Sequence, residues 1–217
     1  MLHIHGATRT WPGSGGPVLA LAPIDLRVAG GELVALRGPS GSGKSTLLLA
    51  CAGLLGLSGG RIEVDGRDLA RLGAAELDRL RARRIGFVFQ RLHLIPYLDV
   101  LDNIRLPALA AGMPGDDGRC AALLDRFGLG GRRHHRPHQL SIGERQRTAL
   151  ARALAPAPGL ILADEPTGSL DAGLGAVVLD ALAEAAADGA AVLVATHDDR
   201  VAARMHRQVA LRPGGRS

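Results

Sequence analysis

Lysine is almost absent from this sequence of 217 residues. Lys44 is the only lysine among 26 basic residues, and the other 25 are arginines. Arginine presents a planar fork of donors, whereas lysine offers a compact ammonium on a flexible stem. Because arginine serves at every other basic position, Lys44 is a candidate for a role that a guanidinium cannot fill.

Aromatic residues and cysteines are also scarce. Phe, Trp and Tyr make up 2% of the chain, so the core must consist mainly of Leu, Val, Ile and Ala. Cys51 and Cys120 lie in apolar or Ala-rich surroundings without a C-x-x-C spacing. We therefore expect buried free thiols in a reducing compartment rather than a disulfide.

Long hydrophobic runs are missing as well. The longest apolar run, residues 47–57, has 11 residues, whereas roughly 20 are needed to cross a bilayer. The N-terminal segment lacks the basic start and apolar block of a signal peptide. We expect one domain that does not cross a membrane by itself.

The positive charge is spread along the chain. A net charge of +5 and a pI near 10.4 would suit a nucleic acid or an anionic membrane surface. Basic residues cluster only at 81–84 and 132–138. This pattern favours a solvated arginine-rich surface, and we expect no nucleic acid as a partner.

Residues 38–46 read GPSGSGKST and fit the phosphate-loop pattern G-x-x-x-x-G-K-[ST]. A strand-like run at 32–37 precedes them and a helix-like run at 44–55 follows them. In such a loop, backbone N–H groups bind phosphate, the lysine reaches the β- and γ-phosphates, and the serine binds Mg²⁺. The alternative is a Gly/Ser-rich turn before a core helix. The nucleotide-binding candidates are Gly38, Pro39, Ser40, Gly41, Ser42, Gly43, Lys44, Ser45 and Thr46, with Ser45 also a metal ligand.

Two acidic residues follow a second apolar run. Residues 160–163 are consistent with a buried parallel strand, and Asp164 and Glu165 come directly after it. Because ligands bind at the carboxyl edge of such sheets, we expect Asp164 to hold Mg²⁺. Glu165 would act as the general base on the attacking water. A pair of solvated loop acids is the alternative.

Two further apolar runs also end in polar residues. His197 follows a run that begins at residue 191, and Gln90 ends the run at 84–90. Taken alone, each would be a structural or surface residue, but four polar strand ends at one sheet edge indicate a site. We expect His197 to contact the γ-phosphate and Gln90 to contact Mg²⁺ or the attacking water, both with catalytic roles.

Residues 139–147, QLSIGERQR, allow two interpretations. Ser141 and Glu144 have the S-x-x-E spacing of a capping box at a helix start. A helix N-terminus is also an anion site, and Ser141 can accept a cap hydrogen bond while donating its own proton to phosphate. The segment therefore predicts a helix start that could sense phosphate.

In their order along the chain, these motifs resemble the ATP-binding subunits of ATP-binding cassette (ABC) transporters. The matches are the phosphate loop (Walker A), Gln90 (Q-loop), LSIGE at 140–144 where the family has LSGGQ (signature), LILADE at 160–165 (Walker B), SLD at 169–171 (D-loop) and His197 (H-loop). The resemblance covers nearly the whole chain. Residues 85–107 and 164–171 look most similar to the branch of lipoprotein release, macrolide export and cell division.

The resemblance implies nucleotide contacts for further residues. Trp11 stands where the family has an aromatic that stacks on adenine, with an ordinary core aromatic as the alternative. Ser141, Gly143 and Glu144 would bind the ATP held by a second subunit. Ile142 replaces a glycine and is tolerable only if that residue is already helical. Glu144 replaces a glutamine and would either complete the capping box or repel the γ-phosphate.

The fold implied by the resemblance is α/β, a P-loop NTPase (RecA-like) core with a parallel sheet, a small antiparallel β subdomain and a helical signature subdomain. We expect a single ABC ATPase domain at 1–217, with the core and β subdomain at about 1–90 and 157–217 and the helical subdomain at about 91–156. The parallel strands should end near Arg37, Gln90, Ala163 and Ala195.

The implied function is ATP hydrolysis that powers a separate transmembrane permease subunit. ATP and Mg²⁺ are the implied cofactors, and a second nucleotide-binding subunit would complete a homodimer or a heterodimer. The implied location is cytoplasmic, peripheral on the inner face of the cell membrane through the permease.

An ABC-type ATPase acting on DNA is the main alternative. Such proteins usually carry a coiled coil or a zinc module between Walker A and the signature, whereas here 95 residues separate Ser45 from Leu140 without heptads or a cysteine cluster. A translation factor of the same superfamily would carry two cassettes. A GTPase would need N-K-x-D, which is impossible with Lys44 as the only lysine. The sequence therefore favours transport.

Overall fold

The computed structural model describes residues 1–213 except residues 15, 114 and 169, so Ser169 of the expected D-loop lies outside the described residues. The strands are β1 Leu2–Trp11, β2 Val18–Val28, β3 Leu33–Arg37, β4 Gly59–Val64, β5 Arg67–Asp68, β6 Ile85–Val88, β7 Leu160–Asp164, β8 Ala191–Ala195 and β9 Arg207–Ala210. The α-helices are α1 Lys44–Cys51, α2 Ala74–Arg84, α3 Val100–Ala110, α4 Asp117–Arg126, α5 Ile142–Leu154, α6 Ala172–Ala187 and α7 Asp199–Ala202. Short 3₁₀ turns are η1 Leu69–Arg71, η2 Gly130–Arg132 and η3 Pro137–Gln139.

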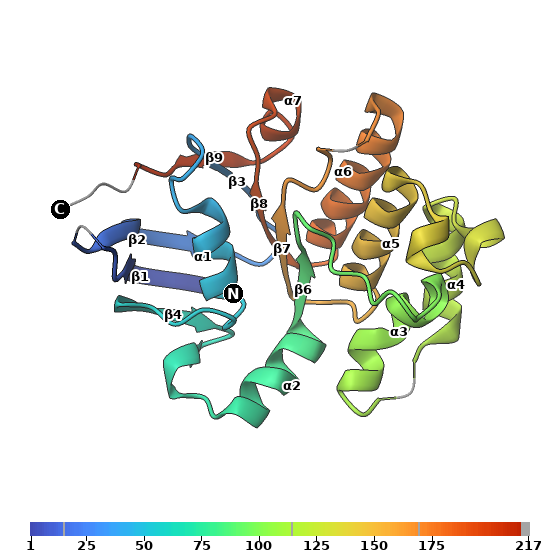
Figure 1. The fold of residues 1–217 in the computed structure, drawn as a ribbon, viewed down its shortest axis with the longest axis horizontal. Coiled ribbons are helices and arrows are strands. Elements are labelled where there is room, and N and C mark those ends of the chain that lie inside the picture. The colour runs from blue at the N-terminus through green and yellow to red at the C-terminus, as the bar shows by residue number, and fades with distance from the viewer. Residues whose placement is uncertain (15, 114, 169, 214–217) are drawn as a thin grey trace.

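Two sheets organise the chain (Figure 1). A parallel sheet has the strand order β6-β7-β8-β3-β9, and an antiparallel sheet has the order β2-β1-β4-β5. The expected combination of a parallel core sheet, a small antiparallel sheet and a group of helices is confirmed. Strand β9, which pairs in parallel with β3, is an addition that the sequence did not predict.

The central strands are buried on both faces. Successive residues of a strand point to opposite sides, so Leu33 and Ala35 of β3 pack in one core while Val34 and Leu36 pack in another. The first core joins the sheet to α3, α4, α5 and α6, and the second joins it to α1 and the antiparallel sheet (Figure 1). The parallel sheet is therefore the middle layer, and its loops at the carboxyl edge lie between the two flanking layers.

The first helix is shorter than its sequence predicts. The apolar run suggested a helix over 44–55, but α1 ends at Cys51. Gly53 adopts a left-handed φ of 64°, and its N–H donates to the carbonyl of Ala50 at 3.0 Å. The N–H of Leu54 donates to the carbonyl of Leu49 at 2.9 Å. These bonds close the helix end at a glycine, so the expected extension to residue 55 is wrong.

Both cysteines are buried free thiols, as predicted. Burial raises the pKa of the Cys51 and Cys120 thiols above the ordinary value. Thiols held in the protonated form are poor nucleophiles and poor metal ligands. Neither cysteine is therefore a candidate for chemistry.

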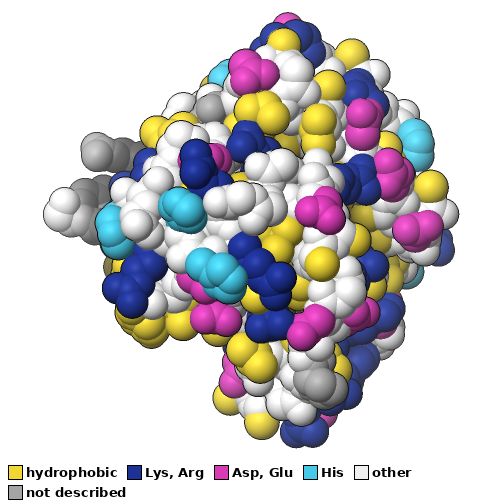
Figure 2. Space-filling view, turned by 90° about the vertical axis from the view of Figure 1, so that its right-hand side faces the viewer, with side chains coloured by type: hydrophobic (Ala, Val, Ile, Leu, Met, Phe, Trp, Pro, Cys, Tyr) yellow, Lys and Arg dark blue, Asp and Glu magenta, His cyan; other side chains and the backbone are white. Residues whose placement is uncertain are grey.

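Surface charge is mixed on the side of the molecule that carries helices α3 to α6, called the helical face here. Figure 2 shows Lys and Arg side chains interspersed with acidic side chains and histidines on this face, rather than gathered in one basic area.

Among the described residues, no helix has both the length and the apolar character needed to cross a bilayer.

The contact between β6 and α5 depends on a glycine. A Cβ atom at Gly86 would lie 2.3 Å from the backbone carbonyl oxygen of Ala153. We predict that Gly86→Ala lowers the free energy of unfolding by about 1–3 kcal/mol, as overpacking does, measured by denaturant unfolding. Gly56→Ala is the matched control, because a Cβ there meets nothing within 4 Å. Equal stability of the two variants would contradict the tight contact.

Candidate functional site

The phosphate loop joins β3 to α1 and leaves the start of this helix open. Gly43, the N-cap, has a φ of 92°, and a Cβ there would lie 2.5 Å from the carbonyl oxygen of Ala20, so only glycine fits. No side chain caps α1, and its first turn carries no acidic residue. Since the first N–H groups of a helix have no partner within the helix, this end is available to an anion.

Lys44 and Ser42 offer further donors at the loop. The Nζ atom of Lys44 donates to the carbonyl oxygens of Gly38 at 2.7 Å and Pro39 at 3.0 Å. The hydroxyl of Ser42 is buried and has no hydrogen-bond partner among the described residues. Phosphate oxygens would accept from both groups, so the loop fits a phosphate.

Asp164 ends β7 and is buried beside the phosphate loop. Burial raises the pKa of its carboxyl, and the charge of Glu165 raises it further, whereas the Ser45 hydroxyl and the charge of Lys44 lower it. A carboxylate with a neighbouring serine hydroxyl is the kind of oxygen donor set that suits Mg²⁺. A divalent cation at this place would favour the ionised carboxylate.

Glu165 occupies a constrained position. Its φ is 50°, a left-handed conformation, and its N–H donates to the carbonyl of Ala195 at 2.9 Å. The Glu165 side chain is 14% exposed. Its Oε1 atom lies 2.7 Å from Nδ1 of His197 and accepts from the His197 N–H at 3.1 Å, while Oε2 accepts from the Thr196 hydroxyl at 3.4 Å. Such a conformation persists only where the surroundings hold it, and here it directs the carboxylate to the end of β8.

One cleft of about 770 Å³ brings these residues together. Gln90, two residues after the end of β6 at Val88, joins it from the loop that follows this strand. The lining residues are Val18, Leu19, Ala20, Gly38, Pro39, Ser40, Gly41, Gly43, Lys44, Ser45, Thr46, Gln90, Asp164, Glu165 and His197. The structure thus places the four polar strand ends in one cleft, while their individual roles stay predictions.

Trp11 is not among the residues that line this cleft. It is 41% exposed, so the alternative of an ordinary core aromatic is wrong. The guanidinium carbon of Arg9 lies 3.9 Å from the centre of its ring. Its cross-strand neighbour, Val18, does line the cleft. Adenine stacking by Trp11 stays a prediction.

The predicted helix start at Ser141 is confirmed. Its Oγ accepts from the N–H of Glu144 at 3.2 Å, and Glu144 Oε2 accepts from the N–H of Ser141 at 2.8 Å. Ile142 is the first residue of α5 and is already helical. Glu144 completes the capping box, and its Oε1 accepts from Nε of Arg132 at 2.7 Å. The Arg132 hydrogen bond, followed by the Ser141 N–H, lowers the pKa of Glu144 to about 2.

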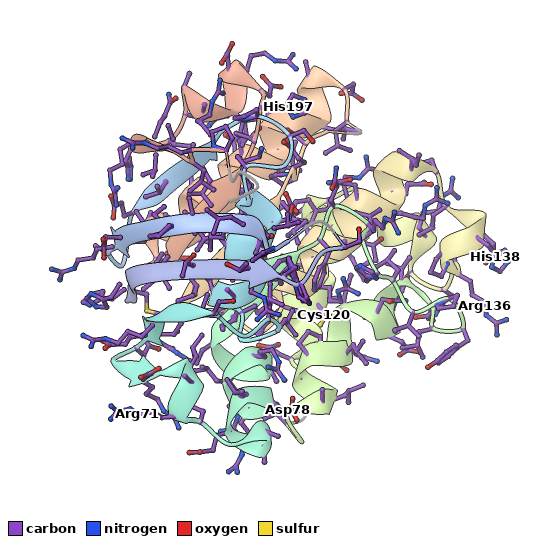
Figure 3. All side chains as sticks on the ribbon, turned by 60° about the vertical axis from the view of Figure 1, so that its left-hand side comes forward. Arg71, Asp78, Cys120, Arg136, His138 and His197 are labelled. Carbon is purple, nitrogen blue, oxygen red and sulfur yellow. The ribbon has the colours of Figure 1, made fainter. Side chains whose placement is uncertain are left out.

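The signature residues Ser141, Gly143 and Glu144 do not line the cleft of their own chain. In Figure 3, His138, which precedes Ser141 by three residues, lies well apart from His197. A single copy therefore presents two separate parts, a cleft at the sheet edge and a capped helix start in the helical portion.

The sequence did not single out Gln146, although this side chain supports Glu165. Gln146 is 3% exposed, and its Nε2 donates to the carbonyl oxygen of Pro166 at 2.7 Å. The carbonyl oxygen of Glu165 itself is 3.5 Å away. A signal was present, because Gln146 shares a helix face with Leu150 and Ala153, which are both buried.

Arg152 holds the loop that contains Gln90. Its guanidinium donates to the carbonyl oxygens of Leu92 at 2.6 Å and His93 at 2.7 Å, and both of these residues have a φ of 44°. Burial lowers the pKa of Arg152 to about 10, so the side chain stays charged at neutral pH. Helix α5 therefore anchors the backbone that follows Gln90 as well as the backbone that follows Glu165.

Comparison with known proteins gives consistent matches. The ABC transporter family matches residues 21–168. The chain is 47% identical to the macrolide export ATP-binding/permease protein MacB 1/2 of Paracoccus denitrificans, over 99% of this chain and 32% of that protein. It is 44% identical to the pyoverdine export ATP-binding/permease protein PvdT of Pseudomonas syringae pv. tomato, over 99% and 33%. The chain spans about a third of the length of these curated relatives.

Two solved structures have the same fold. A dimeric post-hydrolysis state of the ATP-binding cassette MJ0796, bound to ADP and Pi, matches with a TM-score of 0.93 and 37% identity, over 98% of this chain and 95% of that chain. A second dimeric structure of MJ0796, described as a bacterial ABC transporter cassette, matches with a TM-score of 0.90 and 37% identity, over 97% and 94%.

The Arg152 anchor yields a first prediction for the site. Arg152→Met keeps an apolar stem but removes both hydrogen bonds to the loop after Gln90. We expect ATP affinity to be retained and the rate of ATP hydrolysis to fall about tenfold or more, because the loop loses its position. The exposed Arg133→Met is the control, and thermal unfolding shows whether the variants fold. A wild-type rate of ATP hydrolysis in a folded Arg152→Met protein would show that Arg152 does not position this loop.

The capping box yields a pH prediction. The pKa of Glu144 falls from 4.5 to about 2 on folding, so its contribution to stability is present above pH 4.5 and is lost as the pH falls toward 2. Glu144→Gln keeps an acceptor but loses the charge, and we expect it to be about 1 kcal/mol less stable at pH 7. Denaturant unfolding at several pH values should show the difference from wild type vanish between pH 4.5 and 2. A pH-independent difference would contradict this assignment.

Proposed function

We propose that this chain, which belongs to the ABC transporter family, hydrolyses ATP in the cleft and drives a membrane permease with the resulting motion. The observation that carries the proposal is the meeting of the phosphate loop with Gln90, Asp164, Glu165 and His197 in one cleft. A phosphate loop alone would support nucleotide binding. Asp164, Glu165 and His197 at the neighbouring strand ends add groups that can hydrolyse the bound nucleotide.

The nucleotide would lie with its phosphates on the loop and the start of α1. The N–H groups of the loop, Lys44 and the unpartnered Ser42 hydroxyl supply donors to phosphate oxygens. Ser45, Asp164 and Gln90 would hold Mg²⁺, which neutralises phosphate charge when bound. Trp11 would stack on adenine near Val18. Together these residues would bind both the phosphates and the adenine of ATP.

Glu165 would act as the general base. Its carboxylate can accept a proton from a water molecule placed in line with the γ-phosphate. The hydrogen bonds from His197 and Thr196 hold that carboxylate in one orientation. The side chain of His197 is 79% exposed and lines the cleft, so its imidazole remains accessible to the γ-phosphate.

A second copy of this chain would complete each site. The signature residues are outside their own cleft, and the MJ0796 cassettes of the same fold are described as dimers. In a head-to-tail pair, the capped start of α5 in one copy would face the ATP of the other, with the Ser141 hydroxyl and the helix N-terminus toward phosphate. The Glu144 charge is already matched by Arg132, which limits repulsion. Pairing with a related cassette instead would give a heterodimer.

The permease would receive the motion beside the loop of Gln90. A groove of about 510 Å³ lies there, and its lining includes Phe87, Phe89, Leu106 and Pro107. The rings of Phe87 and Phe89 stack with centres 4.0 Å apart. We assign this mostly apolar groove to a cytoplasmic segment of the permease, which would hold the cassette at the inner face of the membrane.

The permease has two possible arrangements. The sequence resemblance implies a separate subunit, whereas the relatives bear names that combine ATP-binding and permease functions. Those names also mention different cargoes, macrolides and pyoverdine. We therefore assign cargo choice to the permease and ATP hydrolysis to this domain.

The Glu165 assignment yields the central functional prediction. Glu165→Gln preserves shape but removes the proton acceptor. We expect ATP binding to persist while the steady-state hydrolysis rate falls by about a hundredfold or more. Glu184→Gln is the matched control, since this glutamate pairs with Arg126 on the surface. Comparable turnover by Glu165→Gln and the control would exclude Glu165 as the base.

A further inference from the structure

Two histidines and a glutamate meet on the outer face of the antiparallel sheet, apart from the ATP cleft. His3 and His5 alternate along β1, so both point to the same side, while Leu2 and Ile4 point into the core. Glu63 stands directly opposite His3 on the neighbouring strand β4. Cross-strand pairing therefore fixes the backbone beneath all three side chains.

The donor atoms are close enough to share one ion. A ligand atom from each of the three side chains lies within 4.8 Å of the others. Zinc bonds of about 2.0–2.2 Å place tetrahedral ligands a little closer than this, and small side-chain rotations supply the difference. The imidazole rings are 6.3 Å apart at their centres and nearly perpendicular, so they do not stack against each other.

We propose that His3, His5 and Glu63 form a surface zinc site that joins β1 to β4. Two imidazoles and one carboxylate are a ligand set that Zn²⁺ takes, with water in the remaining position. His5 is exposed and the other two side chains are half-buried, so an ion can enter from solvent. None of the three residues lines the ATP cleft, so the site is separate from the site of hydrolysis.

Neighbouring arginines affect the zinc affinity of this site. Arg61 lies opposite His5, and its Nε is 3.1 Å from Glu63 Oε1, so zinc must displace this ion pair. The Arg61 side chain is 56% exposed and can turn into solvent. Arg27 lies opposite His3 on β2. Burial, followed by the charge of Arg27, lowers the pKa of His3, and a lower pKa favours the neutral imidazole that binds metal.

The site is tested by titrating Zn²⁺ into the full chain, without a histidine tag and without nucleotide, by calorimetry. We expect one equivalent to bind and to raise the midpoint of thermal unfolding. His5→Ala and Glu63→Gln should each weaken binding by about tenfold or more. Arg61→Ala should tighten binding, because it frees the Glu63 carboxylate. His138→Ala, at an exposed histidine of the helical portion, should leave affinity unchanged.

Three results would overturn the proposal. Zinc affinity that is equal in wild type, His5→Ala and Glu63→Gln would place the ion elsewhere, and so would a loss of binding in His138→Ala. A weaker affinity in Arg61→Ala would show that the carboxylate is not the ligand that Arg61 masks. Circular dichroism of each variant confirms that the sheet is intact, so a folding defect is not mistaken for a lost ligand.

Discussion

The pairing register of β7 with β8 is the constraint on which the cleft depends. Asp164 pairs with Ala195, and the N–H of Glu165 donates to the carbonyl of Ala195, so Glu165 and His197 emerge side by side. The N–H of Thr196 in turn donates to Leu36 of β3, just before the phosphate loop. A slip of one residue would turn Asp164 to the opposite face of the sheet. The proposed positions of phosphate, metal and general base are therefore set together by backbone pairing.

Helix α5 forms the second organising element. Its capped start carries the signature residues, and along its length Gln146 and Arg152 hold the backbone after Glu165 and the backbone after Gln90. Close-packed elements transmit strain, so a displacement of the start of α5 would reach both loops. This geometry connects the surface that would face a partner's ATP to the loops after Glu165 and Gln90 in the same chain.

The parts of the site that the sequence predicts are those defined by local pattern. Lys44 stands in a complete phosphate-loop motif, Asp164 follows an apolar run, and the S-x-x-E spacing at Ser141 marks a helix cap. The parts that escape prediction depend on contacts between distant segments. Strand β9, for example, is defined only by its pairing with β3.

The same reason explains the missed polar contacts. Arg132 reaches Glu144 from a separate 3₁₀ turn, and Arg152 reaches a loop that lies 59 and 60 residues away in sequence.

The shared site is tested most directly by mixing two variants that we expect to be inactive alone, Lys44→Ala and Gly143→Asp. A Cβ atom at Gly143 makes only ordinary contacts, so the fold of the second variant should hold. Sites shared across a dimer predict little ATP hydrolysis by either variant alone and restored hydrolysis in the mixture, where an intact phosphate loop meets an intact signature. A mixture no more active than the separate variants would contradict shared sites.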